Sequence, residues 1–190
     1  METLREPLES GHIRIARAAR SVQYPARFQL VAAMNPCPCG WAGDRSNRCL
    51  CSDERINRYR ARVSGPLLDR IDLHIGVTRM DAVELRESTP LGEPSAAVRA
   101  RVEAAHARQQ VRGGLNAHLP PAALRACTRL GEADQDMLEQ AIERLQLSAR
   151  AMHRILRVAR TIADLAGCET IQTAHLAEAI GYRQLDRRKP

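Results

Sequence analysis

The hydrophobic pattern of this chain changes its period once, and that change limits the possible folds more than any other feature of the sequence. Before about residue 85 the apolar residues mostly alternate with polar ones or form short continuous runs, which is typical of β-strands. The segment 86–95, "RESTPLGEPS", is dense in Pro, Ser and Gly, and after it the apolar residues recur with the 3.6-residue period of amphipathic helices. The pattern predicts an α/β part over residues 1–88 and an all-α part over residues 95–190.

A β-hairpin is predicted close to the start of the sequence. Apolar residues alternate with polar ones on both sides of a short interval, at Ile13, Ile15, Val22 and Tyr24. Such alternation is typical of two strands that are exposed on one face. The predicted tip carries Arg17 and Arg20.

Two continuous apolar runs follow the hairpin, "FQLVAAMN" at 28–35 and "IDLHIGV" at 71–77. Continuous runs of this length are typical of strands that are buried on both faces at the centre of a parallel sheet. Residues 53–63, which lie between the runs, have helical spacing. Strand, helix and strand in this order predict an α/β unit with an incomplete parallel sheet.

The all-α part is predicted to be a helical bundle. Five helices are expected, at about 95–112, 120–129, 133–146, 149–166 and 173–182. The third of them shows one apolar stripe, formed by Met137, Leu138, Ala141, Ile142 and Leu145. Because the chain has one Phe and one Trp, we expect cores built from Leu, Ile, Val and Ala.

Composition indicates two compact units and a basic surface. The chain has 190 residues, of which 44% are hydrophobic, enough for one full core or two small ones. Lys and Arg outnumber Asp and Glu by 29 to 22, and nearly all the basic residues are arginine, which favours bidentate contacts with phosphate or carboxylate. A polyanionic partner is therefore expected. The alternative is a solvated basic surface without a partner.

The sequence predicts a cytoplasmic chain that makes no use of a membrane. No apolar run approaches the roughly 18 residues of a membrane span, and no signal-peptide pattern precedes the first hairpin. In a reducing compartment the six cysteines are expected to be thiols or metal ligands rather than disulfides.

Asn35 is the first candidate site residue. It ends the apolar run 28–35 and directly precedes Pro36. Ligands of open α/β sheets bind beyond the carboxyl ends of the strands, so a carboxamide at this position can orient a water molecule or a phosphate oxygen. The alternative is an asparagine that caps a turn before the proline.

Arg70 is the second candidate, within "SGPLLDRIDLH" at 64–74. Apolar neighbours on both sides limit its rotamers, which suits an arginine that presents one guanidinium to a phosphate. The alternative, equally compatible with the spacing, is an internal ion pair with Asp69 or Asp72.

Arg150 is the third candidate, within "LSARAMHRILRVARTIADLAG" at 147–167. Ser148 is a good N-cap, so Arg150 would lie in the first turn, where a cation opposes the helix dipole by roughly 0.3 to 1 kcal/mol. A bound anion at this helix end would explain that placement. For Arg154 and Arg157, which continue the same face, we expect a solvated charged surface.

Four cysteines form two C-x-C pairs, at Cys37, Cys39, Cys49 and Cys51. Four thiolates from two short loops can close a tetrahedral zinc site, although C-x₂₋₄-C is the more usual spacing. The alternative is a loop of reduced thiols. Cys127 and Cys168 fall within helical patterns and are expected to be small core residues.

With these residues in place, the chain resembles the Mg-chelatase-like AAA+ ATPases of the ComM/YifB type, bacterial proteins linked to competence and recombination. The resemblance covers about residues 4–185 and is carried by "LREPLESGHIRIARA", "YPARFQLVAAMNPCPCG", "SGPLLDRIDLH" and "LSARAMHRILRVARTIADL". It implies that Asn35 is the sensor 1 residue, which orients the attacking water. It also implies that Arg70 is the arginine finger for a neighbouring subunit's ATP and that Arg150 is sensor 2.

The hairpin is similar to the presensor-1 hairpin of replicative MCM helicases. That similarity implies that Arg17 and Arg20 face single-stranded DNA in the pore of a ring. A solvated hairpin tip is the alternative, because related chelatases have a comparable hairpin and act on no DNA.

The sequence departs from the family's pattern in one respect. It contains no G-x-x-x-x-G-K-[ST] loop and no hydrophobic run that ends in paired acidic residues, and ATP hydrolysis requires both the phosphate loop and the Mg²⁺ carboxylates. The family places both upstream of residue 1. The resemblance therefore implies the C-terminal part of a hexameric ATPase that uses ATP and Mg²⁺ and acts on DNA, with half of the AAA+ core and a helical lid. We predict that this chain alone hydrolyses no ATP.

Two other functions remain open at this stage. The chain could be a zinc-bearing module that binds nucleic acid or protein without ATPase activity, or part of a true chelatase that inserts Mg²⁺ into a porphyrin. The cysteine-rich stretch after Asn35 favours the ComM/YifB branch by resemblance.

Overall fold

The computed structural model describes residues 2–17, 20–44, 46–79 and 92–183. The packing of the Cα atoms divides the chain into two compact units, Met1–Ile71 and Asp72–Pro190. The predicted boundary segment 86–95 lies mostly outside the described residues. No helix within the described ranges combines the length and the apolar character needed to cross a membrane.

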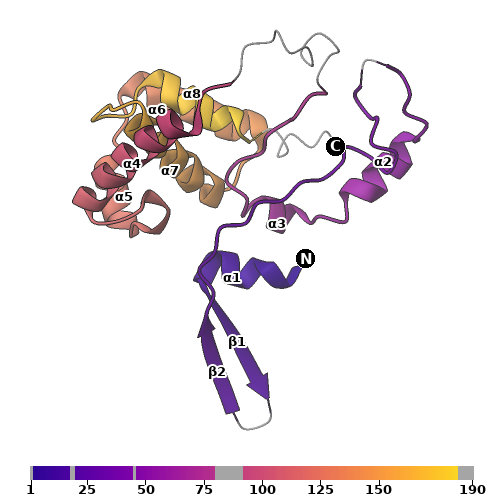
Figure 1. Ribbon diagram of the computed structural model, residues 1–190, viewed down its shortest axis with the longest axis horizontal. Helices are drawn as coiled ribbons and strands as arrows, with labels where there is room; N and C mark the ends of the chain where they lie inside the picture. The colour runs from indigo at the N-terminus through magenta and orange to yellow at the C-terminus, as the bar shows by residue number, and fades with distance from the viewer. Residues whose placement is uncertain (1, 18–19, 45, 80–91, 184–190) are drawn as a thin grey trace. The chain divides into compact units, whose positions relative to one another are not determined.

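The first unit contains short helices and one hairpin (Figure 1). Its elements in chain order are the 3₁₀ turn η1 (Glu2–Leu4), α1 (Arg5–Ser10), β1 (His12–Arg17), β2 (Arg20–Pro25), α2 (Asp53–Arg60) and α3 (Gly65–Leu68). The helix predicted at 53–63 is thus confirmed with an earlier end. Ser52 caps it by accepting a hydrogen bond from the Arg55 N–H (3.3 Å), and acidic residues occupy its first turn, where they complement the helix dipole.

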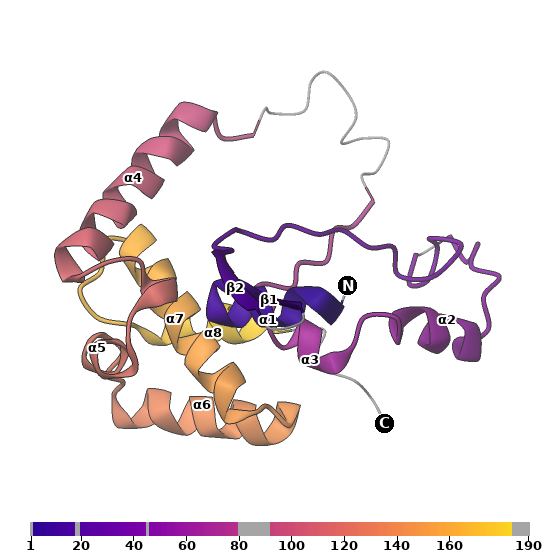
Figure 2. The ribbon, with the colours of Figure 1, turned by 90° about the horizontal axis from the view of Figure 1, so that it is seen from below.

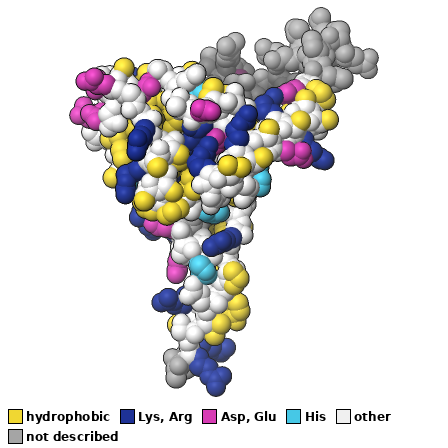
Figure 3. Space-filling model, turned by 90° about the vertical axis from the view of Figure 1, so that its left-hand side faces the viewer, with side chains coloured by type: hydrophobic (Ala, Val, Ile, Leu, Met, Phe, Trp, Pro, Cys, Tyr) yellow, Lys and Arg dark blue, Asp and Glu magenta, His cyan; other side chains and the backbone are white. Residues whose placement is uncertain are grey.

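The predicted hairpin is confirmed, with Arg17 opposite Arg20 at its tip. The antiparallel register also places Ile13 opposite Tyr24 and Ile15 opposite Val22. Since side chains alternate between the faces of a strand, these pairs share one face. All four apolar side chains on it are about half exposed (43–54%), and yellow side chains line one edge of the hairpin in Figure 3.

The two predicted central strands are not formed, and this part of the prediction is wrong. Residues 28–35 and 72–77 are extended but carry no strand ladder, and the one sheet among the described residues is the β1–β2 hairpin. Val31 is 85% and Val77 90% exposed. Burial on both faces requires neighbouring strands and covering layers, and the described residues supply neither.

The second unit is a helical bundle, as predicted (Figure 2). Its elements are α4 (Ser95–Arg112), the 3₁₀ turn η2 (Asn116–His118), α5 (Pro121–Cys127), α6 (Glu132–Leu145), α7 (Ala149–Leu165) and α8 (Thr173–Gly181). The five predicted helices agree with α4 to α8 within two residues at each end. Their local signals are strong: Ser148 caps α7, and Gly113 ends α4 in the left-handed conformation (φ 116°).

The main hydrophobic core lies among α6, α7 and α8. Its buried members are Leu138, Ala141, Leu145, Ile155, Ala159, Ala163, Ile171, Leu176, Ala179 and Ile180. The stripe predicted on α6 supplies three of these residues, and Met137 and Ile142 pack against them. Of the expected Leu, Ile, Val and Ala, the buried members are Leu, Ile and Ala, and Val158 packs against them partly buried. Cys168 is partly buried against this core.

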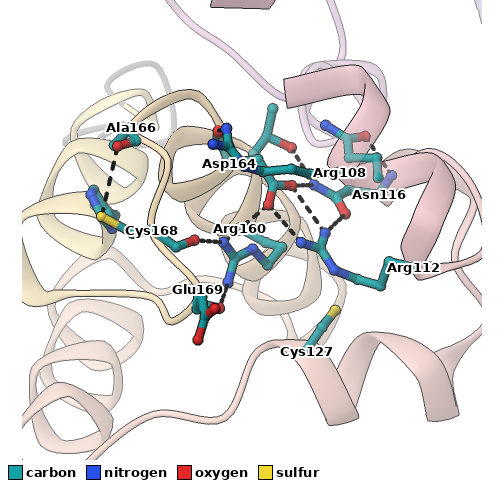
Figure 4. A network of polar contacts seen from close by, with 12 residues as sticks. Arg108, Arg112, Asn116, Cys127, Arg160, Asp164, Ala166, Cys168 and Glu169 are labelled. Atoms are coloured by element: carbon teal, nitrogen blue, oxygen red, sulfur yellow. Dashed lines mark hydrogen bonds and ion pairs between the residues drawn. The ribbon is translucent and has the colours of Figure 1, made fainter. Parts of the chain in front are cut away.

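A buried polar network joins α4 and η2 to α7 (Figure 4). Asp164 is fully buried and accepts hydrogen bonds from Arg112 (2.6 and 3.0 Å) and from the Asn116 carboxamide (2.8 Å). Arg160 approaches the same carboxylate at 3.0 Å. Two arginines thus offset the charge of one buried carboxylate, so the helices are tied together by directed bonds as well as by apolar contact.

Candidate functional site

The four cysteines predicted as metal ligands come together in the first unit. Their sulfur atoms all lie within 4.8 Å of one another, and the Sγ atoms of Cys37, Cys39 and Cys49 are separated by 3.3, 3.7 and 3.8 Å. Zinc bound tetrahedrally at about 2.3 Å from each thiolate holds the sulfurs about 3.8 Å apart. All four cysteines are free thiols, so the donor set and its dimensions fit zinc.

The thiols of the two C-x-C pairs differ in acidity. Burial raises the pKa of Cys37, but hydrogen bonds from Cys39 and from the Ala42 N–H (3.3 Å) more than offset it and lower that pKa to about 6. The Trp41 N–H lowers the pKa of Cys39. A hydrogen bond from the Cys51 N–H lowers the pKa of Cys49, but burial and the nearby Cys39 and Cys37 outweigh it and raise that pKa to about 11.

Burial likewise raises the pKa of Cys51. The pKa values of the first pair are thus lowered and those of the second pair raised. Because the thiolate is the metal ligand, uptake of a divalent cation by this set releases protons.

Asn35 lies immediately before this cysteine cluster and is exposed. Pro36 follows it and restricts the Asn35 backbone to extended conformations. The chain then turns: the Gly40 N–H donates to the Cys37 carbonyl (3.0 Å), and Gly40 is left-handed (φ 80°). A Cβ atom on Gly40 would lie 4.0 Å from the Asn35 Cγ, so the carboxamide sits against the cysteine turn.

Arg70 follows the short helix α3 in the first unit. Its guanidinium pairs with Glu9 and donates to the Pro66 carbonyl (2.7 Å), and its side chain is only 9% exposed. An internal ion pair was the alternative considered for this residue, but the acidic group is Glu9, 61 residues away, rather than a neighbouring aspartate. An open hollow beside the pair is lined by Thr3, Arg5, Glu6, Glu9, Ser10 and Arg70.

Arg150 lies in the first turn of α7 and is exposed. Ser148 is the N-cap, as predicted, and its hydroxyl accepts from the Ala151 N–H (3.1 Å). The arginine therefore lies at the positive end of the helix dipole, a combination suited to an anion. Asn35 and Arg70 belong to the first unit, and Arg150 belongs to the second.

The expected solvated face at Arg154 and Arg157 is wrong. Arg154 forms an ion pair with Asp72 (2.5 Å). Arg157 donates to the carbonyl groups of Asn116, Ala117 and Leu119 at 2.6–3.1 Å. Burial lowers the pKa of Arg157, and so does the positive charge of nearby Arg154. Arg154 thus holds a side chain, and Arg157 holds the backbone of η2 and its neighbours against α7.

Arg17 and Arg20 are exposed at the end of the hairpin, where dark-blue side chains gather in Figure 3. Their side chains lie on the face that carries the apolar pairs, because Arg17 pairs with Arg20 in the same register. A phosphate or another anion can approach both guanidinium groups from solvent.

Sequence reasoning missed two sets of contacts. It did not foresee Glu9 as the partner of Arg70, and nothing in the sequence signals a pair so far apart. It also missed the network around Asp164. There the signal was present, because Arg160 and Asp164 stand four residues apart among the apolar positions of one helix, and charged residues on an apolar stripe require partners.

Two family models match consecutive parts of the chain. The model described as magnesium chelatase, subunit ChlI, matches residues 1–85, and that of the ChlI C-terminal part matches residues 92–183. "Competence protein ComM" of Haemophilus influenzae is 47% identical over 188 residues, which cover 98% of this chain and 36% of that protein. "Uncharacterized protein YifB" of Escherichia coli is 45% identical over 188 residues, 98% of this chain and 37% of that protein. This chain thus spans just over a third of these curated relatives and corresponds to their C-terminal part.

Proposed function

Because the chain belongs to the magnesium chelatase-like family of the ComM/YifB type, we propose that it forms part of a cytoplasmic AAA+ ATPase. In this proposal the whole protein is a homohexameric, ATP-driven motor that moves single-stranded or branched DNA. Residues 1–88 belong to its AAA+ core and residues 95–190 form its helical lid. The observation that carries the proposal is the match of nearly the whole chain to relatives that include a competence protein.

Three residues have assigned roles at the nucleotide. Asn35 orients the attacking water through its carboxamide, Arg70 stabilises the charge on a neighbouring subunit's γ-phosphate, and Arg150 binds phosphate at the start of α7. The exposed position of Arg150 beside a capped helix end supports its role. Arg70 is held by Glu9, so the finger must exchange this carboxylate for phosphate. The sequence has no G-x-x-x-x-G-K-[ST] loop and no apolar run that ends in paired acidic residues, so no step at Mg²⁺ is assigned to its residues.

Zinc is proposed as the resident metal of Cys37, Cys39, Cys49 and Cys51. Bound there, it cross-links two chain segments, and it is assigned no role in the chemistry of ATP. This cross-link would contribute much of the stability of the first unit, because only Pro7, Cys37 and Leu67 are buried among its described residues. Units with so small a core commonly depend on a metal or a disulfide.

The cysteine cluster also favours a second candidate function, a zinc-bearing module that binds nucleic acid without ATPase activity. The two candidates differ in their dependence on nucleotide. The first requires Asn35, Arg70 and Arg150 for turnover, whereas the second leaves these residues without a chemical role.

The proposal is tested by a mant-ATP titration and an ATPase assay, each with and without Mg²⁺. The samples are this 190-residue chain and a longer chain in which the upstream part of the Haemophilus relative precedes it. We expect binding and turnover only in the longer chain, and a loss of turnover of about 10³-fold in Arg70→Ala. Arg144→Ala, which removes an exposed arginine of α6, is the matched control. Turnover by the 190-residue chain alone, or full activity of Arg70→Ala, contradicts the proposal.

A further inference from the structure

The cysteine cluster and Asn35 form one continuous piece of structure. Asn35, Pro36 and Cys37 are consecutive, so the first metal-ligand candidate lies two residues after the carboxamide. The turn from Cys37 to Gly40 brings the chain back beneath the Asn35 side chain, to the 4.0 Å approach described above. Any force that fixes this turn therefore also limits where the carboxamide can point.

The second C-x-C pair closes a ring around the same position. Cys51 is followed at once by Ser52, which caps α2. The last residue of that helix, Arg60, donates from its Nε atom to the carbonyl of Pro36 (3.1 Å). The chain thus runs from Pro36 through both cysteine pairs and α2 and returns to Pro36, with the sulfur cluster linking the two pairs across the ring.

Little else among the described residues of this unit holds the ring in place. Of the ring residues only Cys37 is buried, and the preceding segment 28–35 has no strand ladder. In the loop between the two cysteine pairs, the Arg48 guanidinium lies over the Trp41 indole, 3.9 Å from its centroid. A bond between the sulfurs would add to the Arg60 hydrogen bond, the Arg48–Trp41 contact and the turns of the loop.

We propose that zinc bound by the four cysteines, together with Arg60, acts as a positioning device that fixes the orientation of the Asn35 carboxamide. The metal closes the ring on one side and Arg60 closes it on the other. The cysteines and Arg60 are positioning residues, because none of them is required to touch nucleotide. The functional consequence, that ATP turnover follows zinc occupancy, rests on the proposed role of Asn35, but the positioning itself does not.

The test uses the 190-residue chain labelled with ¹⁵N, without nucleotide. Zinc is removed with a chelator and titrated back, while metal content and the side-chain carboxamide resonances are followed. The Asn35 signals are identified by their disappearance in Asn35→Asp. We expect saturation at about one zinc per chain, with Asn35 signals that shift and gain heteronuclear NOE in step with occupancy. The buried Asn116 carboxamide, in the second unit, is the internal control and should not change.

Variants distinguish an effect of zinc and Arg60 on the Asn35 carboxamide from a general loss of folded structure. Cys49→Ser should lose stoichiometric zinc and leave Asn35 in its metal-free state, whereas Cys168→Ser, outside the cluster, should behave as the unmodified chain does. Arg60→Ala should keep its zinc and yet shift the Asn35 signals. Arg58→Ala is its matched control, because Arg58 lies in the same helix and pairs only with exposed Glu54 among the contacts described for it.

Each outcome bears on the proposal. Zinc that binds while the Asn35 signals stay unchanged overturns the positioning device and leaves the metal site intact. Failure to bind zinc overturns both. Asn35 that follows zinc in this chain, combined with a longer chain that lacks ATPase activity, supports the device and removes the proposed function.

Discussion

Asp164 is the residue on which the second unit most depends for its polar contacts. Burial raises the pKa of its carboxyl group, but hydrogen bonds from Arg112 and Asn116 and the charge of Arg160 outweigh burial, so the pKa is lowered. Asp164→Asn keeps the shape of the side chain and removes its charge, which leaves Arg112 and Arg160 without a charged partner at this position. We expect a loss of about 3 kcal/mol in the free energy of unfolding, measured by urea denaturation followed by circular dichroism.

The same carboxylate makes a prediction about acid stability. Its pKa is lower in the folded chain than in the unfolded one, so it stabilises the fold above the unfolded value, about 3.9, and this contribution is lost as the pH falls through the folded pKa. The unmodified chain should therefore lose stability below about pH 4 more steeply than Asp164→Asn does. Glu143→Gln is the control, because it removes one carboxylate from the exposed face of α6. Parallel pH profiles for the unmodified chain and Asp164→Asn would contradict the assignment.

Whether the role of a residue could be predicted depends on how far along the sequence its partners lie. The Ser148 cap and the C-x-C spacing were predicted because their signals lie within a few residues. The ion pairs were not, since Arg70 meets Glu9 across 61 residues and Arg112 meets Asp164 across 52. Arg157 illustrates the same limit, because its three backbone acceptors lie about 40 residues before it. The sequence indicated a solvated side chain, whereas the structure shows one that is hydrogen-bonded to three carbonyl groups.

At the scale of elements, helices were predictable and the central strands were not. A helix satisfies its own backbone hydrogen bonds, so periodicity and caps place it within two residues, as they did for α4 to α8. The hairpin is nearly as local, because its strands adjoin in sequence. A central strand takes its hydrogen bonds and its burial from other strands, and the runs 28–35 and 71–77 find none among the described residues.

The hairpin tip gives the element-scale prediction. Arg17 and Arg20 are cross-strand neighbours, and like charges in this position destabilise a hairpin. Replacement of both by alanine should therefore leave the hairpin at least as stable while weakening its binding to single-stranded DNA. If both arginines contact phosphate, the plot of log binding constant against log salt concentration should become shallower in the variant, its slope smaller in magnitude by about 1.4. Fluorescence anisotropy with an oligothymidine at several salt concentrations measures the slope, and amide exchange of β1 and β2 measures hairpin stability.

The double variant Arg125→Ala, Arg144→Ala is the matched control for charge. Both residues are exposed arginines in the last turns of helices of the second unit. An equal loss of affinity in this control would mean that DNA senses only net charge, and the hairpin would then have no special role.

At the scale of the whole molecule, the two extended segments, 28–35 and 72–77, carry large apolar side chains that are exposed to solvent. Phe28, Val31 and Met34 on one segment, and Leu73, Ile75 and Val77 on the other, are exposed to between 46% and 90%. Backbone outside a strand ladder can also pair with a strand of another chain. Exposed apolar segments of this kind bind other chains or one another.

We therefore predict that this chain associates with itself in a concentration-dependent way, through these segments. Val31→Lys combined with Val77→Lys places a charge on each, which opposes strand pairing and apolar contact. The matched control is Val111→Lys, because Val111 is 92% exposed on α4, so the same substitution there adds the same charge outside the extended segments. Sedimentation velocity over a wide concentration range should show association in the unmodified chain and in the control, and a monomer in the double variant. If all three chains stay monomeric, exposed apolar backbone of this length is tolerated, and neither segment needs a neighbouring strand to remain in solution.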